Sequence, residues 1–212
     1  KVINADKAGV GEVIAKTVGM FTGYLDNQAA YDEDVIDGWM HTGDAGYFKP
    51  SGHLVIIDRI KDLATTSNGV QYSPQYIENK LKFSSFIGEA VILGKDKPYL
   101  SAIICIRFSI VSKWAEQQGY GFTNYTSLSA LPEVYQKLTE EVEKVNSTLP
   151  DAQKINKFIL LYKELDADDG ELTRTRKVRR TVIADKYGDI INSIYDNKTM
   201  VDIDTVIIAS IN

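Results

Sequence analysis

The sequence predicts a mixed α/β (α+β) fold in which flanking helices cover a central sheet. Apolar runs rich in β-branched residues, which are typical of strands, occur at 89–94, 99–108 and 156–162. Apolar residues at helical spacing occur between and after these runs, most clearly at 132–149. Strands mixed with helices in one chain define this fold class. The 212 residues are enough for one large domain or two small ones.

The first part of the chain is expected to contain strands and one short helix. Residues 10–18 have the composition of a strand, 24–37 form a short polar helix with its loops, and 46–59 form a β-hairpin. Turn residues at 50–52 connect the arms of this hairpin, and the β-branched run 55–57 forms its return strand.

A change of composition predicts a domain boundary near residues 59–61. The segment that follows is polar and ends in Asn68-Gly69, a dipeptide that is typical of turns. We therefore divide the chain into a first domain, 1–59, and a second domain, 60–212.

The second domain begins with a helix whose start is well marked. Ser73 is expected to cap this helix, and Pro74 takes the first helical position, where a missing N–H costs least. Ile77 and Leu81 then lie on one face, four residues apart. The sequence therefore predicts a helix over 73–83.

Three more helices are expected beyond the strands at 89–94 and 99–108. These helices are 110–118, 132–149 and 178–195. The second has one apolar stripe, formed by Val134, Leu138, Val142 and Val145. The Ser/Thr/Gly/Asn-rich segment after the first is expected to be a loop. The tail 201–211 alternates too loosely for an assignment.

The overall composition argues against some classes of function. The net charge of −5 and the pI near 5.1 disfavour a general nucleic-acid binder. No apolar run approaches the roughly 18 residues that span a bilayer, and no signal peptide is visible. The single cysteine, Cys105, lies in an apolar run and indicates a buried residue in a reducing compartment. The chain starts without methionine, as if strands were already under way, which indicates a fragment of something longer.

The glycine-rich segment 37–48 resembles a turn and contains Asp44, the strongest candidate for a ligand-binding residue. The carboxylate of Asp44 can accept two hydrogen bonds from the vicinal hydroxyls of a ribose. The alternative is a turn aspartate that caps its own backbone. Arg59 offers a planar fork of donors for phosphate or sugar oxygens, and its alternative is an ion pair with Asp58 or Asp62. Local chemistry leaves both alternatives open.

The segment 174–180 holds five basic residues in seven. It could be a nucleic-acid patch, a solvated helix start, or the carrier of one lysine that reaches a polyanion such as ATP. The chain's acidity counts against the first, and the acidic run 165–173 is expected to compensate the basic charge. The sequence has no phosphate-loop motif and no metal-ligand cluster, and His41 and His53 are too far apart for a zinc site.

Three segments together resemble one family, the AMP-forming acyl-CoA synthetases of the adenylate-forming superfamily. Residues 38–48 (GWMHTGDAGYF) resemble its ribose-binding motif, 52–79 its hinge motif with the following loop, and 170–180 (GELTRTRKVRR) its carboxy-terminal catalytic-lysine motif. Their order and separation agree across 9–195. The helix-rich stretch 114–149 and the form of the third motif resemble the long-chain branch, the fatty-acid–CoA ligases.

The resemblance implies a role for five residues. Asp44 would hold the ribose hydroxyls of ATP, and Arg59 would contact the same ribose–phosphate region. Lys61 would be the hinge about which a small domain rotates, and Gly69 would pack close to the pantetheine arm of coenzyme A. Lys177 would be the catalytic residue that meets the fatty-acid carboxylate and the α-phosphate during adenylation.

The third motif departs from the family pattern at two positions. Arg174 and Arg176 stand where family members more often have proline and an apolar residue, so the turn before Lys177 is expected to differ. Arg179 and Arg180 are weaker candidates than Lys177 for the catalytic cation.

The resemblance also implies what each domain is. Residues 1–59 would be the end of the large adenylation domain, its β-rich subdomain, and 60–212 would be the small mobile α+β domain. The full-length enzyme would use a fatty acid, ATP, Mg²⁺ and coenzyme A. The phosphate loop, the adenine- and Mg²⁺-binding motif and the fatty-acid tunnel would lie in the missing amino-terminal domain. This chain alone is therefore expected to be inactive, and no residue of it is expected to bind a metal.

Two other functions stay open at this point. One is the adenylation domain of an acyl-AMP ligase or peptide synthetase, which would deliver its acyl group to a carrier protein. The other is a stand-alone regulatory or binding domain. In each case we expect a cytoplasmic protein without a nucleic-acid partner or a transmembrane segment, and the sequence leaves peripheral association with a membrane open.

Overall fold

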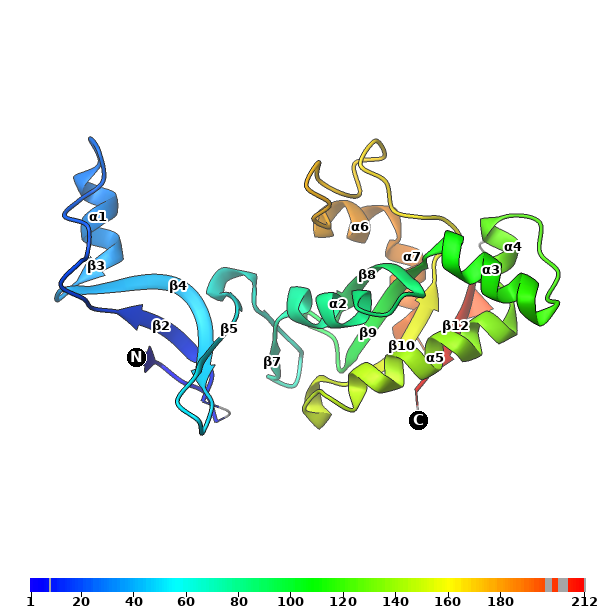
Figure 1. Cartoon of the computed structure of the whole chain (residues 1–212), viewed down its shortest axis with the longest axis horizontal. Coiled ribbons are helices and arrows are strands. Elements are labelled where there is room, and N and C mark those ends of the chain that lie inside the picture. Colours follow the sequence, from blue (N-terminus) through cyan, green and yellow to red (C-terminus); the bar gives the residue numbers. More distant parts are fainter. Residues whose placement is uncertain (8, 197–199, 202–205, 212) are drawn as a thin grey trace. The chain divides into compact units, whose positions relative to one another are not determined.

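The computed structural model describes residues 1–7, 9–196, 200–201 and 206–211. The chain forms two compact units, Lys1–Leu63 and Ala64–Asn212, whose elements are labelled in Figure 1. Strands and helices are mixed as the sequence predicts, which confirms the fold class. The division between the units lies close to the predicted boundary, and the assignment of 60–63 to the second domain stays a prediction.

The amino-terminal unit is an antiparallel sheet with one short helix. Its elements are β1 (Val2–Ile3), β2 (Gly11–Ala15), α1 (Gln28–Asp34), β3 (Val35–Ile36), β4 (Trp39–Phe48) and β5 (Leu54–Arg59). Strand β4 pairs with β2, β3 and β5, so it is the centre of the sheet. The predicted β-hairpin is confirmed by the antiparallel pairing of Phe48 with Leu54 and of Tyr47 with Val55.

The glycine-rich segment 37–48 is a strand over most of its length, so its interpretation as a turn is wrong. The pairing of β4 on both sides explains the strand, because neighbouring backbones supply hydrogen bonds that local propensity does not reveal. A Cβ atom on Gly46 would lie 2.5 Å from the backbone oxygen of Val55. This glycine therefore permits close approach of the two strands and does not mark a turn.

The carboxy-terminal unit is built on a second, mixed sheet. Its strands, in spatial order, are β11 (Met200–Val201), β12 (Val206–Ser210), β10 (Ile155–Leu160), β9 (Leu100–Ile106) and β8 (Ile87–Leu93). Only the β9–β10 pair is parallel within the described sheet. A parallel pair needs a long crossover, and the segment between these two strands contains three helices. The tail that the sequence left unassigned contributes β12.

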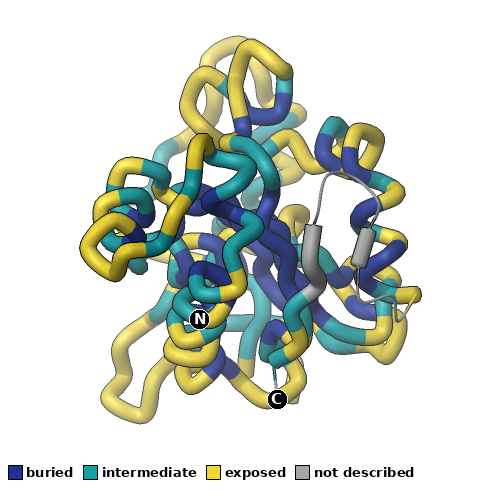
Figure 2. Tube along the Cα trace, turned by 90° about the vertical axis from the view of Figure 1, so that its right-hand side faces the viewer, coloured by how far each residue is buried: buried dark blue, intermediate teal, exposed yellow. Residues whose placement is uncertain are grey.

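Helices cover both faces of this sheet (Figure 1). The helices of the unit are α2 (Pro74–Lys82), α3 (Phe108–Gln118), α4 (Tyr125–Ser129), α5 (Pro132–Asn146), α6 (Arg180–Lys186) and α7 (Gly188–Tyr195), with a short 3-10 turn at Asp151–Gln153. The first four pack against one face and the last two against the other. Ala102 and Ile104 of β9 belong to one apolar cluster, and Ile103 and Cys105 belong to the other. Figure 2 shows this buried centre of the unit.

The predicted start of the first helix of this unit is confirmed, and two other helix predictions are corrected. The Ser73 side chain accepts a hydrogen bond from the Tyr76 backbone at 3.0 Å, and Pro74 is the first residue of α2. The polar segment predicted as a loop contains α4, which begins with a capping box between Asn124 and Ser127. The predicted helix 178–195 is two helices, α6 and α7. No helix in the described part of the chain is long and apolar enough to cross a membrane.

Candidate active site

Asp44 and Arg59 form a cross-strand pair in the amino-terminal unit. They lie opposite each other on β4 and β5, and the Arg59 Nη1 atom is 2.8 Å from the Asp44 Oδ1 atom. The same nitrogen donates to the Thr42 carbonyl oxygen at 3.0 Å. Both side chains remain partly exposed, Arg59 by 54% and Asp44 by 31%. The carboxylate keeps acceptor capacity beyond this one contact, because an ionised carboxyl group has about four lone-pair sites.

The structure shows the local contacts of both residues, and their roles in ligand binding stay predictions. Asp44 lies in the middle of a strand and faces Arg59, so it is not a turn aspartate. Arg59 pairs through its side chain with Asp44, while the Asp58 carboxylate accepts the Arg59 backbone N–H at 2.9 Å.

A second set of contacts orients β4 beside this pair. The Thr42 hydroxyl donates to the Val13 carbonyl oxygen at 2.6 Å and accepts the Asp44 N–H at 3.1 Å. His41 Nδ1 lies 3.0 Å from a carboxylate oxygen of Glu12 on β2. Sequence reasoning missed these supports, because Glu12 lies far from the motif along the chain and no local signal connects them.

Lys61 lies in a 3-10 turn, Ile60–Asp62, directly after β5. Its side chain is exposed, and the turn is two residues from the division between the two units at Leu63. This position is compatible with the hinge role that the resemblance implies, and the role itself stays a prediction.

Gly69 lies at the tip of a small hairpin in the carboxy-terminal unit. The hairpin consists of β6 (Ala64–Thr65) and β7 (Gln71–Tyr72), and the Gly69 N–H donates to the Thr66 carbonyl oxygen at 3.0 Å. Gly69 has φ +83°, a conformation that other residues rarely adopt. A Cβ atom built on it would have no neighbour within 4 Å among the described residues. The predicted turn is confirmed, and it leaves room for a ligand to approach the backbone.

Lys177 lies on a second tight turn of the carboxy-terminal unit. Leu172 and Val178 form an antiparallel bridge, and Thr173 N–H donates to the Lys177 carbonyl oxygen at 2.8 Å. The Thr173 hydroxyl accepts the Lys177 N–H at 2.9 Å. We call residues 172–178 the lysine hairpin. The Lys177 side chain is exposed and has no hydrogen bond or ion pair with any described residue.

The Arg180 side chain pairs with the carboxylate of Glu78. Its Nη2 atom lies 2.7 and 2.9 Å from the two carboxylate oxygens of Glu78, and its Nη1 atom donates to the Ile92 carbonyl oxygen at 3.2 Å. Glu78 on α2 is 4% exposed. Burial raises the pKa of Glu78, and Arg180 and the Ile92 N–H oppose this change. These contacts favour Lys177 over Arg180 as a cation that is available to a ligand.

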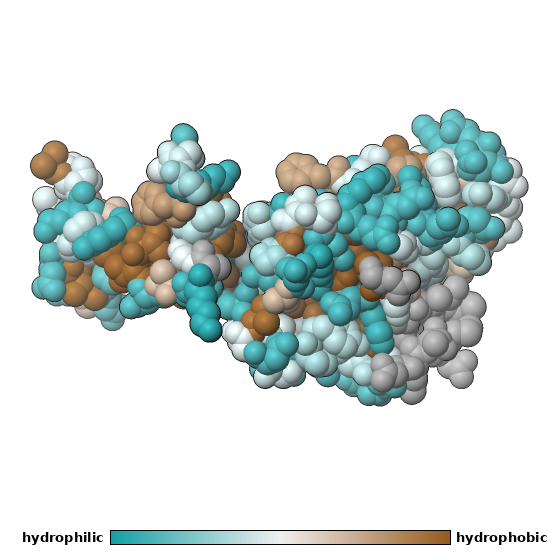
Figure 3. Space-filling model, turned by 90° about the horizontal axis from the view of Figure 1, so that it is seen from below, coloured by the Kyte–Doolittle hydropathy of each residue, from teal (hydrophilic) through white to brown (hydrophobic). Residues whose placement is uncertain are grey.

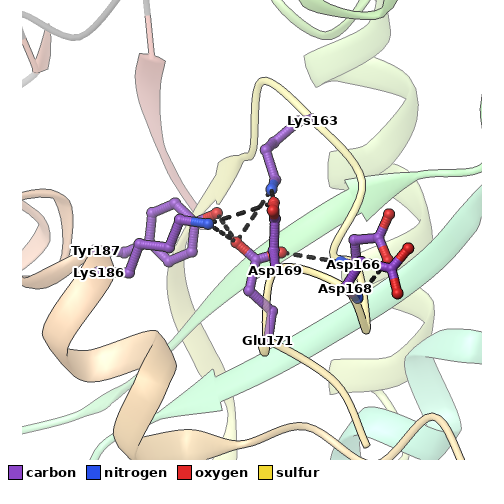
Figure 4. A network of polar contacts seen from close by, with 7 residues as sticks. All are labelled: Lys163, Asp166, Asp168, Asp169, Glu171, Lys186 and Tyr187. Atoms are coloured by element: carbon purple, nitrogen blue, oxygen red, sulfur yellow. Dashed lines mark hydrogen bonds and ion pairs between the residues drawn. The ribbon is translucent and has the colours of Figure 1, made fainter. Parts of the chain in front are cut away.

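Two acids of the run 165–173, Asp169 and Glu171, form ion pairs with lysines outside the basic segment 174–180. Glu171, which is fully buried, contacts Lys163 and Lys186 at 3.1 and 2.7 Å (Figure 4). The Tyr187 hydroxyl donates to the same carboxylate oxygen at 2.6 Å. Asp169 also pairs with both lysines. For these two acids the expected compensation of 174–180 is wrong, since their partners come from other segments.

Two further observations limit the chemistry of this chain. Cys105 is buried, and burial raises the pKa of its thiol to about 12, so it is a poor nucleophile. Within the described ranges, no three His, Cys, Asp or Glu side chains lie close enough together to hold a metal ion.

Comparison with protein families gives a match over most of the second unit. The model of the AMP-binding enzyme C-terminal domain matches residues 61–199. This range contains Gly69 and Lys177 and excludes Asp44 and Arg59.

Curated relatives extend the similarity to nearly the whole chain. A long-chain-fatty-acid–CoA ligase of Mycobacterium tuberculosis, FadD15, is 31% identical over 89% of this chain and 32% of its own length. The human long-chain-fatty-acid–CoA ligase ACSBG1 is 30% identical over 94% of this chain and 30% of its own length. The chain thus spans about a third of the length of these relatives.

Solved structures share the fold at low sequence identity. The adenylation domain of a carboxylate reductase from Mycobacterium chelonae has a TM-score of 0.62 at 19% identity, over 89% of this chain and 28% of that one. The equivalent domain from Segniliparus rugosus, solved with AMP and a carboxylic acid, has a TM-score of 0.60 at 19% identity, over 88% and 28%. At this identity the likeness shows the fold alone.

Proposed function

Because the chain belongs to the family of AMP-binding enzymes with this C-terminal domain, we propose that it is the carboxy-terminal part of a long-chain fatty-acid–CoA ligase. The full-length enzyme would join a fatty acid to AMP and then transfer the acyl group to coenzyme A. This chain would supply the end of the adenylation domain and the small mobile domain, and it would be inactive without the amino-terminal domain.

The observation that carries the proposal is the contrast between Lys177 and its neighbour Arg180. Lys177 is an exposed cation of its hairpin, without a partner among the described residues, whereas Glu78 holds the Arg180 side chain. An ammonium group that is not already paired can meet an incoming anion, and fixed positive charge is what attack of a carboxylate on a phosphate requires.

The first half-reaction joins two anions. A carboxylate oxygen of the fatty acid attacks the α-phosphorus of ATP, a new P–O bond forms, and pyrophosphate leaves. Lys177 would neutralise charge at the carboxylate and the α-phosphate. The Asp44 carboxylate would accept hydrogen bonds from the ribose hydroxyls of ATP. Arg59 would hold the Asp44 carboxylate in place and would also contact the ribose–phosphate region. Mg²⁺ would add positive charge at the phosphates when it is bound.

The second half-reaction uses a different part of the small domain. The thiolate of coenzyme A attacks the acyl carbon of the acyl adenylate, a thioester forms, and AMP leaves. The open space at Gly69 would admit the pantetheine arm. Rotation about Lys61 would exchange the lysine hairpin for the Gly69 hairpin between the two steps.

The cytoplasmic location stays a prediction that rests on composition.

The test uses the full-length enzyme and measures the two half-reactions separately. Lys177→Ala should lower ATP–pyrophosphate exchange by about 100-fold or more, which is the typical effect of removing a group that stabilises transition-state charge. Formation of acyl-CoA from preformed acyl adenylate should change by less than about threefold, because this step no longer needs that cation. Equal loss in both half-reactions would contradict the proposed role of Lys177.

Arg179→Ala is the matched control, since Arg179 is also an exposed cation next to the hairpin. The Arg179→Ala enzyme should retain both half-reactions.

A full-length enzyme that makes acyl adenylate but transfers the acyl group only to a carrier protein would favour the acyl-AMP ligase or peptide-synthetase alternative over the fatty-acid–CoA ligase.

A further inference from the structure

Glu171 occupies the base of the lysine hairpin and is the most deeply buried carboxylate in that region. Its side chain has no exposed surface. Its own carbonyl oxygen accepts the Arg179 N–H at 2.9 Å, so the residue joins the chain before the hairpin to the chain after it. Its N–H donates to the Asp166 carbonyl oxygen at 3.0 Å. The backbone of Glu171 thus closes the hairpin that carries Lys177.

The Glu171 carboxylate binds three separate segments to this base (Figure 4). Lys163 follows β10, while Lys186 and Tyr187 come from the end of α6, and all three contact the Oε1 atom. The other oxygen, Oε2, accepts the Asp166 N–H at 2.9 Å. Every polar atom of the carboxylate therefore has a partner, which is the condition under which a buried charge fixes a geometry.

The charge of this group is maintained in the folded protein. Burial alone would raise the pKa of Glu171, but Lys186, the Tyr187 hydroxyl, the Asp166 N–H and Lys163 together lower it. The carboxylate is ionised at neutral pH and attracts both lysines. Leu172 and Val178 at the base of the hairpin also pack in an apolar cluster, whereas the side chains of Arg174, Thr175, Arg176 and Lys177 are exposed.

From this arrangement we infer that Glu171 is a positioning residue for adenylation, which holds the base of the lysine hairpin so that Lys177 presents its ammonium group to the reacting anions. The inference rests on the proposed function, because it takes Lys177 as the cation of the first half-reaction. Glu171 does not touch substrate in this role. It acts through Lys177, and a small displacement of a catalytic group is enough to slow a reaction.

The experiment substitutes Glu171→Gln in the full-length enzyme, which removes the charge and preserves the shape. ATP–pyrophosphate exchange should fall by about 10- to 100-fold. Formation of acyl-CoA from preformed acyl adenylate should change by less than about threefold, since that step does not use Lys177. Hydrogen exchange in a peptide that covers 172–178 should accelerate, because the Thr173 and Lys177 amides lose their fixed hairpin.

Asp169→Asn is the matched control. Asp169 pairs with the same two lysines but is 48% exposed and lies outside the hairpin base. It should leave both half-reactions and the exchange of 172–178 unchanged. If Glu171→Gln does not fold, Tyr187→Phe removes one hydrogen bond to the carboxylate and keeps the ring, and a selective loss of about threefold or more in adenylation is then expected.

Two results would overturn the inference. One is unchanged adenylation in the folded Glu171→Gln or Tyr187→Phe enzyme, and the other is equal loss of both half-reactions, which indicates a general structural role. Lys177→Ala separates this inference from the proposed function. If Lys177→Ala retains adenylation, the proposed function fails. If it loses adenylation while Glu171→Gln retains it, only the role of Glu171 fails.

Discussion

The two units of the chain bury their apolar side chains to different extents. Among the described residues, the amino-terminal unit buries Val13, Ile14 and Ala45. The large apolar side chains that it leaves exposed are Val18, Tyr24, Leu25, Ile36, Phe48, Leu54, Ile56 and Ile60. Figure 3 shows hydrophobic residues on the surface of this unit. Single exposed apolar residues are common, but a set of this size in a small unit leaves little buried apolar area to stabilise its sheet.

The carboxy-terminal unit has the opposite character. It has an apolar cluster on each face of its sheet, and Phe83 is its exposed large apolar residue in the part that the structure describes. Its buried charges are paired, as the Glu78–Arg180 and Glu171 contacts show. The difference indicates that the second unit has a hydrophobic core on both faces of its sheet, whereas the first has a regular sheet with an incomplete hydrophobic core.

The largest expected effect is a difference in autonomous folding. We expect residues 64–212 expressed alone to unfold in one cooperative transition, because both of their apolar clusters are retained. We expect residues 1–63 alone to lack a cooperative transition, since burial of a few apolar side chains does not offset the loss of chain entropy. Circular dichroism during thermal unfolding measures both. A cooperative transition in 1–63 would contradict the comparison.

A smaller effect is expected when a phenylalanine is removed from each unit. Phe158 on β10 is fully buried and stacks on Tyr135 with ring centroids 5.9 Å apart. Phe158→Ala should lower the free energy of unfolding by about 3–5 kcal/mol, because it leaves a cavity. Phe48→Ala, at a position that is 51% exposed, should change it by less than about 0.5 kcal/mol. Urea unfolding checks both variants, and similar losses would show that the amino-terminal sheet has a core after all.

The smallest difference between the two units concerns their polar pairs. At pH 7, Glu171→Gln should lower the free energy of unfolding by about 3 kcal/mol, because the variant breaks a buried charge network. Asp44→Asn should cost about 0.2–1 kcal/mol, since its partner Arg59 is largely exposed.

The loss caused by Glu171→Gln should depend on pH. The folded-state pKa of Glu171 lies below its ordinary value of 4.5, so the ionised form is stabilised by folding. This stabilisation is present above that pH and is lost as the pH falls through the folded value. Urea unfolding between pH 3 and pH 7 should therefore show wild type and variant converging in acid. A difference that does not change with pH would contradict the charge-based explanation.

Much of the second unit could be predicted from local signals. The cap at Ser73, the proline at Pro74 and the apolar stripe of α5 marked their helices, because caps and periodicity act within a few residues. The helix α4 was missed, although its Asn124 cap with Ser127 three residues later was a readable signal. The break between α6 and α7 at Tyr187 was missed because the apolar spacing continues across it.

The candidate site divides in the same way. The motif residues Asp44, Arg59, Gly69 and Lys177 were named from the sequence. The structure adds that Asp44 and Arg59 are paired and that Lys177 has no partner among the residues it describes. Contacts beside these motif residues join positions that are distant along the chain. Glu78 is 102 residues from Arg180, and Glu12 is 29 residues from His41. Such pairs leave no local pattern.

The sequence by itself determined the mixed fold class, most of the helix and strand positions, the family resemblance and the candidate residues. These features depend on residue type, spacing and short-range hydrogen bonds. Only the tertiary structure decided that 37–48 is mainly a central strand, that the tail joins the sheet as β12, and that the Glu171 carboxylate pairs with Lys163 and Lys186. Each of these depends on which distant backbones and charges meet, and that is settled by packing of the whole unit.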